Sequence, residues 1–236
     1  MSQIDIIRRF AQQVLTVPTL TGRSDNCLWD RAQRLVRNVE HISRLPELAN
    51  SGLQIDQFCL TAAAYFCEAG IARYADARNT AAQMVSANVN ADDLRDFSTQ
   101  IVTEKLTAAL PGPKIDKINK IIAESGNRFT EMTEAMILSD ARSIDDMGAV
   151  GLFNEFYRCV IHGQGVSDAL QSWKRKIDYQ YFNARLKETF RFQSVRRLAA
   201  QRFAAAEHFM NQLRVESTAQ DLEELIIESF EENKST

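Results

Sequence analysis

Apolar side chains recur every three or four residues through most of the chain, which is the spacing of one face of an α-helix. No segment alternates apolar and polar residues as a half-buried strand would. The pattern therefore predicts an all-α protein, an irregular helical bundle. The expected helices cover residues 4–14, 29–42, 54–77, 79–88, 92–110, 115–122, 130–140 and 151–162, with further helices up to residue 230.

Turn-forming residues separate these segments. Pro18 ends the first helix, residues 46–52 form a short loop, and Pro111–Gly112–Pro113 forces a break. Asn90 is placed to cap the helix that follows it. The segment 54–77 is apolar on almost every side and contains small residues that allow close packing, so we expect it to be one central buried helix.

The length of 236 residues is enough for one well-packed domain. We expect a single helical domain over residues 1–236, in which 1–22 form an N-terminal helix and linker and 216–236 form an acidic C-terminal helix and tail. Hydrophobic residues make up 45% of the chain and charged residues 25%, as in an ordinary globular protein.

Neither a signal peptide nor a run of the roughly 18 apolar residues that cross a bilayer is present, so we expect a cytoplasmic protein without a membrane partner. The cysteines do not form CxxC pairs and are expected to be reduced packing residues. They are Cys27, Cys59, Cys67 and Cys159.

Charge is unevenly spread along a chain of net charge −3. Residues 174–202 are strongly basic and residues 216–232 are acidic. The simplest interpretation is two solvated helix faces, so nucleic acid is not the expected partner. The apolar edge of the acidic segment, which is formed by Leu222, Leu225, Ile226 and Phe230, would allow docking on the body or a homodimer.

The segment 131–156 contains the first candidate site residues, which are acidic. An apolar helical run delivers Asp140 close to Ile137 and Leu138, and Asp145 follows one turn later. A carboxylate beside buried apolar residues needs a partner or a metal ion. We therefore take Asp140 as the first candidate site residue.

This segment resembles the distal half of the HD-domain phosphohydrolases, whose motif EA-x-I-L-x-DAD-x-L-D-x-x-GA-x-G carries the last metal-binding Asp. The matching residues here are Glu134, Ala135, Ile137, Leu138, Asp140, Ala141, Asp145, Gly148, Ala149 and Gly151. Residues 181–213 resemble the closing helices of the small stand-alone bacterial members. The resemblance implies an HD-domain-like bundle.

The resemblance also implies a divalent metal held by two His and two Asp on several helices, which activates water to attack a phosphate ester. Three of these four positions differ in this sequence. Arg31 stands at the first His, and Cys67 and Glu68 stand at the His-Asp doublet, so that Asp140 alone is retained. A guanidinium has no lone pair to give a metal, and we expect Arg31 to pair with Glu68 or Asp140 instead.

We therefore expect a catalytically degenerate protein whose vestigial pocket, Arg31, Cys67, Glu68 and Asp140, binds a small phosphorylated ligand or a protein partner, with no cofactor. The candidate phosphate contacts are Arg34, Arg196, Arg197 and Arg202.

Two alternatives remain open. One is an active phosphohydrolase whose Mn²⁺, Mg²⁺ or Zn²⁺ is held by Glu68, Asp140 and Asp145. The other is a regulatory or nucleic-acid-binding protein that uses the basic segment 174–202. The scattered histidines, His41, His162 and His208, do not form a ligand set by spacing.

Overall fold

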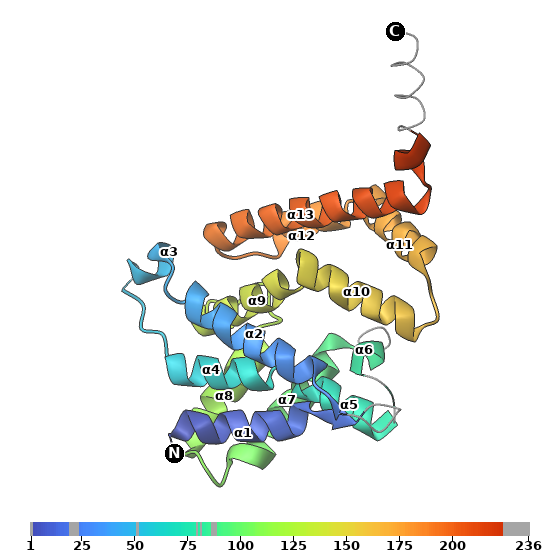
Figure 1. Cartoon of the computed structure of the whole chain (residues 1–236). Coiled ribbons are helices and arrows are strands. Elements are labelled where there is room, and N and C mark those ends of the chain that lie inside the picture. Colours follow the sequence, from blue (N-terminus) through green and yellow to red (C-terminus); the bar gives the residue numbers. More distant parts are fainter. Residues whose placement is uncertain are drawn as a thin grey trace, which may run out of the picture. The chain divides into compact units, whose positions relative to one another are not determined.

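The structure is a computed structural model that describes residues 2–18, 24–50, 52–78, 80, 82–85 and 89–223 (Figure 1). Helices dominate this part of the chain, which confirms the predicted all-α helical bundle. A pair of two-residue strands, β1 (Val17–Pro18) and β2 (Ser24–Asp25), was not predicted and joins Val17 to Asp25 in antiparallel register. Within the described residues, no helix is long and apolar enough to cross a membrane.

The chain folds into two compact units. The first consists of Met1–Asp145 and Thr189–Arg196, and the second of Asp146–Glu188 and Arg197–Thr236. Thus the short segment 189–196 belongs to the first unit although both its neighbours in sequence belong to the second. The organisation as one functional domain stays a prediction.

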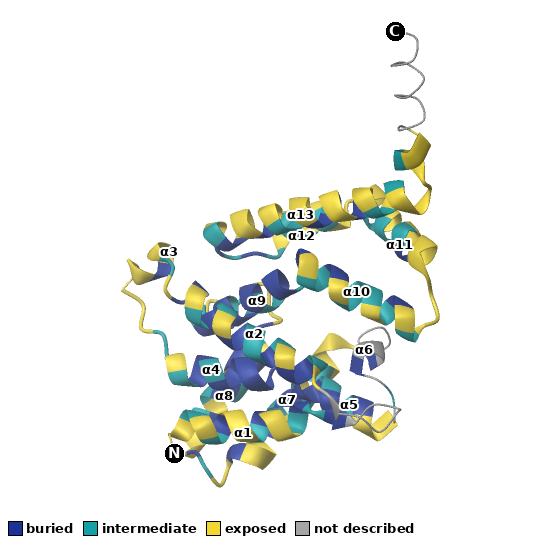
Figure 2. Cartoon of the chain, viewed as in Figure 1, coloured by how far each residue is buried: buried dark blue, intermediate teal, exposed yellow. Residues whose placement is uncertain are grey.

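The first unit is built around α4. This helix packs against α1, α2, α8 and α9, and much of it is buried (Figure 2). Leu60 and Phe66 on it are fully buried. The helices of the unit are α1 (Gln3–Leu15), α2 (Cys27–Ile42), α3 (Pro46–Ala49), α4 (Gln57–Phe66), α5 (Ala69–Arg78), α6 (Ala82–Val85), α7 (Ala91–Leu106), α8 (Gly112–Glu124) and α9 (Thr133–Asp145).

The prediction of one continuous helix over residues 54–77 is wrong, because the chain breaks between α4 and α5. The backbone N–H of Gly70 donates to Oγ of Ser98 at 2.8 Å, and this hydroxyl lies 3.2 Å from the carbonyl oxygen of Cys67. A side chain from α7 thus takes the place of regular hydrogen bonds within the helix. The break leaves Glu68 between the two helices.

Other predicted boundaries shift by a few residues. Asn90 caps α7 as predicted, since its side chain accepts the N–H of Asp92 at 3.1 Å. The predicted loop 46–52 contains α3, which has Pro46 at its first position. Helix α9 runs five residues beyond its predicted end at Asp140, because Ala141 and Ile144 continue its buried face. Parts of the predicted helix 79–88 lie outside the described residues.

The second unit contains α10 (Ala149–Ile161), α11 (Val166–Asp178), α12 (Tyr181–Glu188) and the part of α13 (Gln193–Ser217) that follows Arg196. Leu152, Ala206 and Met210 form its buried centre, with Phe156 and Trp173 packed against them. The predicted acidic C-terminal helix lies largely outside the described residues, which end at position 223.

Candidate functional site

Glu68 is buried at the break between α4 and α5, with 3% of its side chain exposed. Its Oε1 accepts a hydrogen bond from Nε of Arg142 on α9 at 3.1 Å. Nε of Arg31 on α2 lies 3.5 Å from the same oxygen. The predicted ion pair between Arg31 and Glu68 is therefore present, and a second guanidinium joins it.

Asp145, at the end of α9, is the second buried carboxylate, and it holds Arg34 in a bidentate pair. Nε of Arg34 donates to Oδ1 at 2.8 Å, and Nη2 donates to Oδ2 at 3.1 Å. Nη1 of Arg31 lies 3.6 Å from the same Oδ2. Arg31 thus bridges the two carboxylates and ties α2 to α9 and to the α4–α5 break.

We call these five residues the arginine cluster: Arg31, Arg34, Glu68, Arg142 and Asp145. Its two carboxylates are each 3% exposed, whereas the arginine side chains are 18–27% exposed. Three guanidinium groups against two carboxylates give the cluster a formal charge of +1, and its positive groups are the ones that reach solvent. Such a surface suits an anion that can accept paired hydrogen bonds.

Contacts from other helices hold the cluster in shape. Ser98 on α7 is fully buried and fixes the backbone on both sides of Glu68. Nδ2 of Asn38 on α2 donates to the carbonyl of Ala141 on α9 at 3.2 Å. Ser98 has no recognisable signal in the sequence, because Cys67 and Gly70 lie about 30 positions away from it. Arg142, by contrast, stands at the second acid of the DAD motif, so an alignment with the motif could have found it.

Cys67, the neighbour of Glu68, is buried and points its sulfur towards the carbonyl of Ala64 at 3.5 Å. Burial, together with the negative charge of Glu68, raises the pKa of the Cys67 thiol to about 12. The thiol is therefore protonated at neutral pH and is a poor nucleophile. Its role in the structure is packing.

Asp140 is fully buried, and its carboxylate binds the backbone of the segment 189–196. Its two oxygens accept the backbone N–H groups of Arg191 at 2.9 Å and Phe192 at 3.0 Å. Burial raises the pKa of Asp140 to about 6, although these two hydrogen bonds favour the ionised form and oppose the shift. Both oxygens of the retained motif residue are thus used to fasten the chain just before α13.

The four predicted phosphate contacts have different surroundings. Arg34 belongs to the arginine cluster. Arg196, in the first unit, donates from Nη2 to the carbonyl of Phe190 at 2.9 Å. Arg197 and Arg202 belong to the second unit, where Arg197 is exposed and Arg202 packs against Gly148, which has φ +81°. The structure therefore joins Arg34 to Arg31 and Arg142 through their shared carboxylates.

The candidate metal ligands Glu68, Asp140 and Asp145 give a divalent ion a poor set of donors. Glu68 and Asp145 are paired with guanidinium groups, and Asp140 accepts two backbone N–H groups. Among the described residues, no group of three or more His, Cys, Asp or Glu side chains is arranged to hold a metal ion. The residues present do not fit the metal shell that the resemblance implies.

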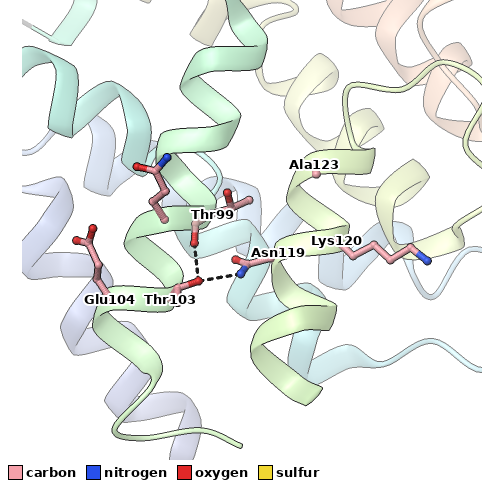
Figure 3. Close-up of a pocket in the computed structure, with 7 residues that line it drawn as sticks. Thr99, Thr103, Glu104, Asn119, Lys120 and Ala123 are labelled. Atoms are coloured by element: carbon pink, nitrogen blue, oxygen red, sulfur yellow. Dashed lines mark hydrogen bonds between the residues drawn. The ribbon is translucent and has the colours of Figure 1, made fainter. Parts of the chain in front are cut away.

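An open groove of about 540 Å³ lies between α7 and α8 and shares no residue with the arginine cluster (Figure 3). Nδ2 of Asn119 donates to Oγ1 of Thr103 at 3.0 Å, and that hydroxyl donates to the carbonyl of Thr99 at 3.0 Å. Lys120 extends away from this chain of hydrogen bonds (Figure 3). Oδ1 of Asn119 is buried without a hydrogen-bond partner among the described residues, and the groove has no concentration of charge.

Neither a protein-family model nor a curated protein sequence matches the chain. Solved structures do match. Bacillus subtilis YpgQ in complex with ADP is 20% identical, with a TM-score of 0.59 over 91% of this chain and 94% of that chain. A Listeria innocua protein, Lin1889, is 18% identical, with a TM-score of 0.57 over 92% of this chain and 98% of that chain.

A Lactobacillus plantarum protein is 19% identical and also has a TM-score of 0.57, over 92% of this chain and 97% of that chain. All three similarities span nearly the whole of both chains. At this level of identity they establish the fold that this chain shares with these bacterial proteins.

Proposed function

We propose that this chain is a catalytically degenerate protein of the HD-domain type that binds a small phosphorylated ligand through the arginine cluster. The proposal combines the motif resemblance around Asp140 with the charges at the positions where the family would place metal ligands. In this account a guanidinium stands where a metal ion would otherwise be, and binding without hydrolysis is the function that remains.

The observation that carries the proposal is the double engagement of Glu68 by Arg31 and Arg142. Coordination of a metal ion by this buried carboxylate would cost free energy, because the two guanidinium groups would lose their partner. The side chains of these two arginines are 18% and 27% exposed, so that their positive charge lies where a phosphate can approach. The site therefore favours an anion over a cation.

The chemistry of the arginines supports a phosphate group. Arginine presents a planar set of donors that matches two oxygens of a phosphate, and Arg34 already holds Asp145 in this bidentate manner. One of the similar solved structures is a complex with ADP. We therefore propose a nucleoside diphosphate or a chemically similar phosphate ester as the ligand class.

We place the protein in the cytoplasm, where such ligands are available. A protein partner for the same site is the weaker form of the proposal, and the structure offers no observation that favours nucleic acid.

Calorimetric titration with ADP tests this proposal. We expect binding that weakens about tenfold or more in Arg34→Ala, because a charge-assisted hydrogen bond contributes roughly 1.5–3 kcal/mol. Arg37→Ala is the matched control, since Arg37 is an exposed arginine on the same helix. Equal affinity of the two variants for ADP would show that the arginine cluster does not bind this ligand.

A further inference from the structure

Arg34 and Asp145 meet along one edge of the guanidinium group. Nε of Arg34 donates to Oδ1 of Asp145 at 2.8 Å, and Nη2 donates to Oδ2 at 3.1 Å. A guanidinium group is planar and has an edge formed by Nε and Nη2 and another formed by Nη1 and Nη2. Asp145 occupies the first of these, which we call the side edge of Arg34.

The other edge of the guanidinium group, which we call the end edge of Arg34, has no acceptor among the described residues. Both hydrogens of Nη1 and the second hydrogen of Nη2 lie on it. The side chain of Arg34 is 27% exposed, whereas that of Asp145 is 3% exposed. The carboxylate is thus buried beneath an arginine that solvent reaches in part.

The pairing with Asp145 fixes the direction of the end edge. Because the guanidinium group is planar, fixing the positions of Nε and Nη2 also fixes that of Nη1. The backbone that carries Arg34 is held as well. Leu35, the next residue in α2, is fully buried, and Asn38, one turn further on, donates to the carbonyl of Ala141 on α9 at 3.2 Å. The end edge is therefore held in place without a ligand.

Asp145 stands at a position that does not favour a carboxylate for the sake of the helix. It is the last residue of α9, where a negative charge meets the negative end of the helix dipole. The bidentate pair with Arg34 offsets this cost, as does Nη1 of Arg31, which lies 3.6 Å from Oδ2. The contribution of Asp145 therefore lies in the arginines that it holds.

We propose that Asp145 is a positioning residue, which holds the side edge of Arg34 so that the end edge binds two oxygens of one phosphate group. This inference rests on the proposed function of the arginine cluster. Two oxygens on one phosphorus match the two parallel donors of the end edge. One guanidinium group then lies between two anions, the carboxylate of the protein and the phosphate of the ligand.

Asp145 acts on an anionic ligand in two opposite ways. Its negative charge repels a phosphate, so a neutral side chain in its place would strengthen binding if charge alone mattered. Its hydrogen bonds hold Arg34, so their loss would weaken binding, because the guanidinium group would have to be ordered when the ligand binds. The sign of the change in affinity therefore distinguishes a positioning residue from a nearby charge.

A double-mutant cycle, measured by calorimetric titration of the full chain with ADP, tests the proposal. We expect Asp145→Asn to weaken binding about tenfold, because an amide can accept only one of the two hydrogen bonds and turns a donor towards the other. In the Arg34→Ala background the same substitution should leave the affinity unchanged or raise it. A loss of affinity in both backgrounds would show a general structural effect and overturn the proposal. Far-UV circular dichroism checks that each variant is folded.

Arg34→Lys tests the use of both edges while Asp145 stays in place. A lysine keeps the positive charge and can pair with Asp145, but its ammonium group has no planar edge to offer a phosphate. We expect Arg34→Lys to weaken ADP binding about as much as Arg34→Ala does. Arg37→Lys, at an exposed arginine on the same helix, is the matched control and should bind ADP like the wild type.

The outcomes separate this inference from the proposed function. ADP binding that weakens in Arg34→Ala but not in Asp145→Asn would leave the phosphate site in place and overturn only the positioning role. Wild-type affinity in Arg34→Lys would likewise overturn the use of the end edge. A wild-type chain that does not bind ADP would overturn the proposed function and this inference together.

Discussion

Arg142 donates a hydrogen bond from Nε to Oε1 of Glu68 at 3.1 Å, which joins α9 to the break between α4 and α5. Both residues stand where the resembling family has acids of its metal motifs. In the HD-type arrangement that we propose, the contact turns two such positions into an ion pair. Single substitutions can measure how much each of these contacts contributes to the free energy of unfolding.

Glu68→Gln should destabilise the protein by about 1–3 kcal/mol, because it removes the charge that balances Arg31 and Arg142. The value is below that of a fully buried pair, since both arginines are partly exposed. Urea unfolding measures the change. Glu104→Gln, which breaks an exposed pair with Arg73, is the control and should cost less than Glu68→Gln. Equal losses in the two variants would contradict the assigned role of Glu68.

Ser98→Ala should cost about 1–3 kcal/mol, because the N–H of Gly70 would lose its buried acceptor. The neighbouring Thr99→Ala removes a hydroxyl that bonds locally to the carbonyl of Asp96, so its effect should be smaller. Chemical unfolding compares the two. If Ser98→Ala were as stable as the wild type, Ser98 would not be what holds the α4–α5 break.

The close packing of α5 on α7 depends on Gly70. A Cβ at this position would overlap the carbonyl oxygen of Leu94, and the backbone there cannot move aside without shifting α7. We expect Gly70→Ala to destabilise the protein by about 2 kcal/mol or more. Gly112→Ala is the control, because nothing lies within 4 Å of its Cβ position. Thermal unfolding should separate the two variants.

The sequence placed most helices because their stability depends on apolar spacing that is local. It could not place the α4–α5 break, which depends on Ser98 from a distant helix. The family resemblance led to Arg31, Glu68 and Asp140 and to the first ion pair. It did not show that Arg34 would be held by Asp145, because this pairing depends on how α2 lies against the end of α9.

The ionisation of Asp140 should change how the free energy of unfolding depends on pH. Its pKa is raised to about 6 in the folded protein, so the folded state binds its proton more tightly than the unfolded state does. The stabilisation from the protonated form is present below about pH 4 and is lost as the pH rises through about 6.

Comparison with Asp140→Asn isolates this effect. The stability of the wild type relative to the variant should fall between about pH 4 and pH 6, by about 3 kcal/mol at most, and level off above this range. Urea unfolding across this range measures the difference. A relative stability that rises with pH would mean that the two backbone hydrogen bonds outweigh burial and that the folded pKa is depressed.

Phosphohydrolase activity with added Mn²⁺, Mg²⁺ or Zn²⁺, measured over a panel of nucleotides and phosphate esters beside metal analysis of the purified protein, tests most directly whether the arginine cluster has replaced a metal centre. We predict that metal content stays well below one ion per chain and that turnover stays at the level of Asp140→Ala under every condition. A stoichiometric metal ion together with hydrolysis that Asp140→Ala abolishes would contradict the account.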